Sequence, residues 1–63
     1  MSPSSDDPAA RVRTLLLRGD NQLKHGRVDA ALESFREARE VEGVAPEVSA
    51  LVERRIASAA ETA

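Results

Sequence analysis

A glycine in the middle of an apolar helical face constrains this chain more than any other residue. Gly19 lies on a face whose other members recur at the three- and four-residue spacing of a helix: Val12, Leu15, Leu16 and Leu23. A glycine within a helix costs about 0.5–1 kcal/mol relative to alanine. Its presence on the apolar face therefore indicates that a second segment approaches closely at Gly19. The alternative is a glycine tolerated in an exposed turn.

Three helices are predicted, over residues 8–24, 28–41 and 46–60. Asp7 can cap the first helix and Pro8 suits its first turn, whereas Gly26 suits the left-handed conformation that ends a helix. Pro46 suits the start of the third helix. The apolar face of the second helix consists of Val28, Ala31, Leu32, Phe35 and Ala38. That of the third helix consists of Val48, Leu51, Val52, Ile56 and Ala59.

The predicted fold is all-α, because strand patterns are absent from the sequence. A connection of only a few residues between the first two helices forces them to pack antiparallel. Ala31 and Ala38 then allow the helices to approach each other, and Phe35 fills the remaining gap next to Gly19. We expect an antiparallel hairpin followed by a third helix in a right-handed arrangement, with residues 1–7 as a flexible tail and residues 8–61 as one domain.

Length and charge limit the possible functions. At 63 residues without cysteine, the chain can form neither disulfides nor thiolate metal sites, and its core is small enough for self-association to be expected. A net charge of -2 with mixed signs argues against a nucleic-acid partner, and the short apolar runs argue against a membrane segment. We therefore expect a cytoplasmic protein with no cofactor and no metal.

Residues 12–46 resemble one tetratricopeptide repeat, a unit of about 34 residues with a Gly in its first helix and a later Ala, Phe and Pro. Gly19, Ala31, Phe35 and Pro46 fill those positions. The chain departs from the pattern at three sites, where Leu15, Arg18 and Gln22 replace the usual Trp, Leu and Tyr. The microtubule-interacting-and-trafficking type of domain has similar helix lengths, but Gly19 fits the tetratricopeptide pattern better. The third helix would match the capping helix of such repeats.

The resemblance implies a partner-binding side on the first helix. The residues expected there are Arg13, Leu16, Leu17, Asp20, Leu23 and Lys24. Apolar side chains mixed with charged ones suit protein recognition. The basic cluster that grips a C-terminal carboxylate in related domains is not reproduced, since Leu16 and Asp20 replace its residues. The alternative is an ordinary surface, with Asp20 and Lys24 as a helical ion pair and Leu17 as an isolated exposed leucine.

Arg55 interrupts the apolar face of the third helix. Its head can reach solvent past that face, or it can meet a carboxylate of a second chain. The second interpretation makes Leu51, Arg55 and Ala59 candidates for self-association in a homodimer.

No catalytic constellation is evident. His25, the single histidine, sits at the expected C-terminus of the first helix, where its charge complements the helix dipole. We therefore do not expect an enzyme. Two functions remain: a module that docks a segment of another protein, and a structural element that multimerises a larger chain or complex.

Overall fold

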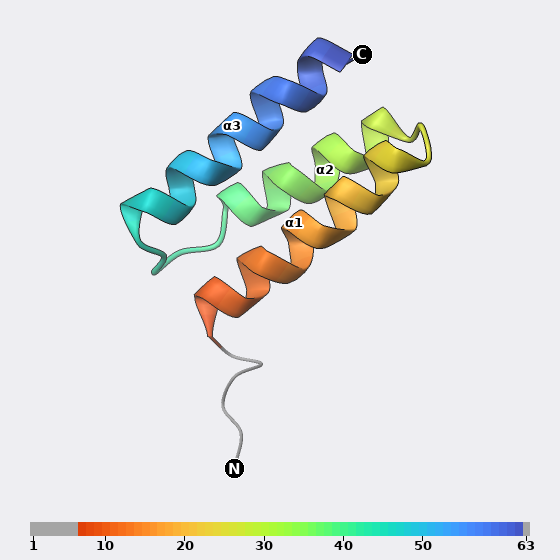
Figure 1. The fold of residues 1–63 in the computed structure, drawn as a ribbon. Coiled ribbons are helices and arrows are strands. Elements are labelled where there is room, and N and C mark those ends of the chain that lie inside the picture. The colour runs from red at the N-terminus through yellow and green to blue at the C-terminus, as the bar shows by residue number, and fades with distance from the viewer. Residues whose placement is uncertain (1–6, 63) are drawn as a thin grey trace.

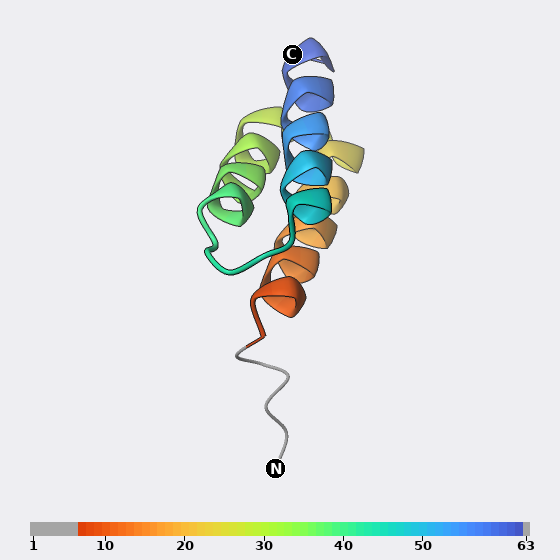
Figure 2. The same ribbon diagram turned by 90° about the vertical axis from the view of Figure 1, so that its left-hand side faces the viewer.

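The computed structural model describes residues 7–62, which form three helices and, within that range, no strands. The helices are α1 (Pro8–Lys24), α2 (Val28–Arg39) and α3 (Pro46–Thr62). Helices α1 and α2 are antiparallel, and α3 returns in the direction of α1 (Figures 1 and 2). The predicted all-α hairpin with a third helix is confirmed. The predicted tail over residues 1–7 lies outside the described residues except for Asp7.

The expected ends of α1 are confirmed in atomic detail. The Asp7 carboxylate accepts a hydrogen bond of 3.2 Å from the backbone N–H of Ala9, and Pro8 is the first helical residue. At the other end, Gly26 has a φ of 77° and its backbone N–H donates to the carbonyl of Leu23. The backbone N–H of Arg27 donates to the carbonyl of Gln22 at 2.8 Å. These two bonds form a Schellman motif, which requires a left-handed residue at Gly26.

The other helix ends differ slightly from prediction. Helix α2 ends at Arg39, two residues before the predicted end, and α3 continues to Thr62, two residues beyond it. Gly43, with a φ of 83°, turns the chain between them. No helix within residues 7–62 has both the length and the apolar character needed to cross a bilayer.

One core joins the three helices. Its buried members are Val12, Leu16, Ala31, Phe35, Ala38, Val52 and Ala59, and the partly buried hydrophobic residues against it are Leu15, Leu23, Leu32, Val41, Val44, Val48 and Ile56. The predicted apolar faces therefore account for most of the core. Val28 and Leu51 are the exceptions, since neither belongs to this core, and Leu51 is 40% exposed.

Gly19 of α1 packs directly against the ring of Phe35 of α2. Both are buried, and Phe35 is fully so. A Cβ atom added to Gly19 would overlap Cε1 of Phe35 and lie 2.7 Å from both Cδ1 and Cζ. The ring thus occupies the space that any other residue at position 19 would need. The predicted close approach at Gly19 is confirmed.

Gly19→Ala is expected to lower the free energy of unfolding, by up to about 2 kcal/mol. Overpacking against Phe35 costs about 1–3 kcal/mol, which exceeds the gain of about 1 kcal/mol from helix propensity. Urea unfolding followed by circular dichroism measures the change. Thr14→Ala, an exposed change on the same helix, should be neutral or slightly stabilising.

Phe35→Leu provides the second control for this contact. Phe35→Leu lowers the free energy of unfolding by itself. In the Phe35→Leu background, however, Gly19→Ala should lower that free energy much less than it does in the parent, because the aromatic ring is absent. A Gly19→Ala protein at least as stable as the parent would show that the contact is not tight.

Candidate protein-binding face

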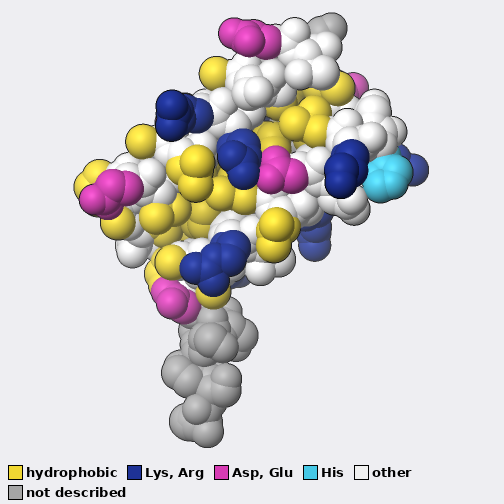
Figure 3. Space-filling model, viewed as in Figure 1, with side chains coloured by type: hydrophobic (Ala, Val, Ile, Leu, Met, Phe, Trp, Pro, Cys, Tyr) yellow, Lys and Arg dark blue, Asp and Glu magenta, His cyan; other side chains and the backbone are white. Residues whose placement is uncertain are grey.

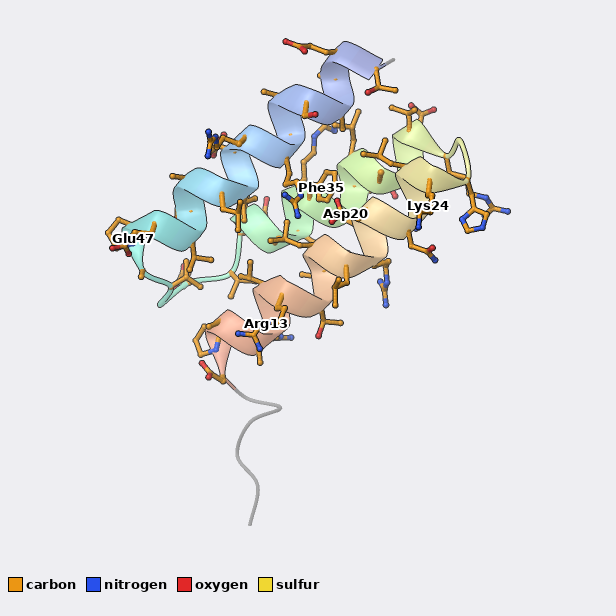
Figure 4. All side chains as sticks on the ribbon, viewed as in Figure 1. Arg13, Asp20, Lys24, Phe35 and Glu47 are labelled. Atoms are coloured by element: carbon orange, nitrogen blue, oxygen red, sulfur yellow. The ribbon has the colours of Figure 1, made fainter. Side chains whose placement is uncertain are left out.

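Four of the six predicted partner-binding residues share one side of α1, the side from which Asp20 contacts α3. Arg13, Leu17, Asp20 and Lys24 fall within about 60° of one another on a helix of 3.6 residues per turn, and we call them the α1 ridge. Figure 4 shows Arg13, Asp20 and Lys24 on the same side of the molecule. Together with Leu51 and Arg55 of α3, the α1 ridge forms what we call the α1–α3 face.

Arg55 is bonded to Asp20 of its own chain. Its Nε donates to Oδ1 of Asp20 at 3.1 Å and its Nη2 donates to Oδ2 at 3.0 Å, so the pair is bidentate. The two side chains are 37% and 41% exposed. Both interpretations from the sequence placed the partner of Arg55 outside the chain, in solvent or on a second molecule. The structure corrects them, because α3 packs in register with α1 and brings Arg55 opposite a carboxylate.

Two large hydrophobic side chains stand out from the described surface. Leu17 is 64% exposed and Leu51 is 40% exposed. Leu17 precedes Asp20 by one turn of α1, and Leu51 precedes Arg55 by one turn of α3. Leu51 and Arg55 line one surface hollow together. Because α1 and α3 run in the same direction, both leucines lie one turn to the N-terminal side of the ion pair, one on each helix. Figure 3 shows a basic and an acidic side chain meeting on this side of the molecule, with hydrophobic side chains around them.

Some predicted site residues are not available at the surface. Leu16 is only 7% exposed and belongs to the core, and Ala59 is fully buried. Leu23 is half-buried against the core, whereas Arg13 and Lys24 are exposed. Leu16 and Ala59 therefore cannot contribute side chains to a binding surface, because the helix faces that carry them pack inward.

A polar contact on the other side of α1 was not anticipated. The hydroxyl of Ser34, a residue that is 5% exposed, donates a hydrogen bond of 2.7 Å to Oε1 of Gln22. The signal was present in the sequence, since Ser34 follows Ala31 by three residues and precedes Ala38 by four. That spacing places Ser34 on the buried face of α2, where a hydroxyl needs a partner.

A surface hollow lies on the side of α1 that borders α2. The hollow between α1 and α2, lined by Pro8, Arg11, Leu15, Glu37, Glu40, Val41 and Glu42, is open to solvent. Residues 7–62 contain no group of three or more His, Asp or Glu side chains placed to hold a metal ion. His25 Nδ1 lies 2.8 Å from the carbonyl oxygen of Asn21, which is consistent with a local cap at the end of α1.

The Asp20–Arg55 pair is expected to show a coupling energy of about 0.5–1 kcal/mol in a double-mutant cycle with Asp20→Ala and Arg55→Ala. Partial exposure limits the value, but the bidentate geometry keeps it above zero. Arg39 and Glu53 provide a matched control, since their single contact is 3.8 Å long and both are about half exposed. Their cycle should give a coupling close to zero. Equal coupling energies for the two pairs would show that the bidentate pair stabilises the packing of α3 on α1 no more than an ordinary surface ion pair does.

Comparison with protein-family models, curated proteins and solved structures gave no match to this chain. Its function is therefore argued from the α1–α3 face.

Proposed function

We propose that this protein is a non-catalytic interaction module that docks a segment of another protein on its α1–α3 face. The observation that carries the proposal is the exposure of Leu17, 64% of whose side chain faces solvent between charged neighbours on a helix whose other side is in the core. Covering such a leucine supplies binding free energy, and the charges around it set the orientation of the partner.

The Asp20–Arg55 pair supports the same proposal. It joins α1, which carries Leu17, to α3, which carries Leu51, and so fixes the two helices relative to each other. A surface that is ordered before binding loses less conformational entropy when a partner arrives. The pair therefore favours recognition by a preformed surface.

The resemblance to a tetratricopeptide repeat points in the same direction. The Gly19–Phe35 contact, the antiparallel hairpin and the third helix are compatible with that resemblance. In that family the first helix contributes to the surface that binds extended peptides or helices. We assign the same role to the α1 ridge.

Self-association is the less favoured function. Of its three candidate residues, Ala59 is buried and Arg55 is bonded within the chain, which leaves Leu51. A symmetric interface built on one half-exposed leucine would bury little apolar area compared with stable dimers.

Peptides selected from a random display library on the immobilised chain are expected to depend on Leu17. Leu17→Ala should weaken their binding about tenfold, because a tenfold change corresponds to about 1.4 kcal/mol and covering a leucine contributes about that much. Fluorescence anisotropy measures the affinity, and circular dichroism confirms that the variant folds.

The control for that experiment is Glu33→Ala, which shortens an exposed side chain of α2 outside the face. It should leave peptide affinity unchanged. Failure to select any peptide, or equal affinities for the parent and Leu17→Ala, would contradict the proposed docking function.

A further inference from the structure

Helix α1 has a charge opposite to that of the whole protein. It carries four basic residues, Arg11, Arg13, Arg18 and Lys24, and one acidic residue, Asp20, which gives it a net charge of four minus one, or +3. The full chain has a net charge of -2. Positive charge is therefore concentrated on the helix that carries the proposed docking surface.

The single carboxylate of α1 is already used. Asp20 is bonded to Arg55 through both of its oxygens. The four basic residues of α1 are exposed, and the two ion pairs found among residues 7–62, Arg39–Glu53 and Arg55–Asp20, do not include them. The α1 ridge thus presents Arg13 and Lys24 to solvent without an acidic partner from the described residues.

The spacing along the α1 ridge defines the shape of a complementary ligand. With a rise of about 1.5 Å per residue, Leu17 lies about 6 Å along the axis from Arg13, and Lys24 lies about 10.5 Å beyond Leu17. An extended segment advances about 3.3 Å per residue. Side chains of an extended segment point alternately to opposite faces, so only residues two or four apart face the ridge together. A partner therefore matches the ridge with a carboxylate two residues before an apolar side chain and another carboxylate four residues after it, about 13 Å further on, which the flexible side chain of Lys24 can reach.

We propose, on the basis of the docking function above, that the α1 ridge binds an acidic extended protein segment of the form Glu-x-Leu-x-x-x-Glu. The apolar side chain covers Leu17, and the flanking carboxylates pair with Arg13 and Lys24. A segment running in either direction along α1 can place a carboxylate near each basic residue. Only one of the two directions also places its apolar side chain over Leu17. The ligand class is thus an internal acidic segment.

A protein segment fits the ridge better than a nucleic acid does. The centre of the ridge is an exposed leucine, which gives a phosphate nothing to pair with. The single aromatic residue, Phe35, is fully buried and offers no stacking surface for bases. A leucine with a basic residue on each side favours a protein segment in which one apolar side chain lies between two acidic side chains.

The test is an NMR titration of the isotopically labelled 63-residue chain with the peptide acetyl-Glu-Ala-Leu-Ala-Ala-Ala-Glu-amide. Amide shifts should move along the α1 ridge, and the affinity should fall several-fold when salt rises from about 50 to about 300 mM because exposed ion pairs are screened. The charge-inverted peptide, with Lys in place of both Glu, should bind at least tenfold more weakly.

Charge reversals on α1 identify the residues involved. Arg13→Glu combined with Lys24→Glu should reduce peptide affinity at least tenfold. Arg18→Glu combined with Arg11→Glu makes the same change in net charge on the flank of α1 that borders α2, and it should reduce affinity less than threefold. Equal losses from both double variants would mean a nonspecific attraction and would overturn the assignment.

Other outcomes would also overturn it. A single-stranded DNA 12-mer that shifts the same amides more strongly than the acidic peptide would assign the ridge to nucleic acid. Sedimentation showing an Arg13-dependent dimer would assign it to a second copy of the chain. Display-selected peptides that depend on Leu17 but lack acidic residues would overturn the acidic ligand and leave the docking function intact, whereas the absence of any selected peptide would count against docking itself.

Discussion

The contact between Gly19 and the ring of Phe35 sets the separation of α1 and α2, and the rest of the structure depends on it. Phe35 is the single aromatic residue and is fully buried, so it supplies the largest apolar side chain of a small core. It can lie there because Gly19 has no Cβ to occupy the same space. With the hairpin closed at this distance, Ala38 and its buried neighbours form one surface against which Val52 and Ala59 of α3 complete the core.

Two polar contacts then fix the orientation of α1 from opposite sides. Gln22 bonds to Ser34 of α2, and Asp20 bonds to Arg55 of α3. Each contact adds little net stability, about 1 kcal/mol or less, because water competes for the same groups. Their effect is on register, since a shift of either neighbouring helix by one turn would leave a buried hydroxyl or a charged group without its partner. Packing among small and aliphatic side chains can be preserved after such a shift, whereas these two polar contacts are lost.

The sequence was most informative where one residue type has a single physical explanation. A glycine on an apolar helix face and a proline after an acidic residue predicted the hairpin and the start of α1 correctly. The partner of Arg55 could not be predicted in the same way, because it lies 35 residues earlier and depends on how α3 is rotated against α1. Leu51 and Leu16 show the same limit. A helical wheel places both near the edge of an apolar face, and only the packing of the neighbouring helix decides which one is buried.

The Asp20–Arg55 pair also determines the charge of the proposed docking surface. Without Arg55, the carboxylate of Asp20 would lie free on the α1 ridge between Leu17 and Lys24, and would repel an acidic ligand. Bonding to Arg55 neutralises that carboxylate and leaves Arg13 and Lys24 as the charges that a ligand encounters. One intramolecular ion pair therefore links fold and recognition, since the contact that orients α3 against α1 also gives the ridge its positive potential.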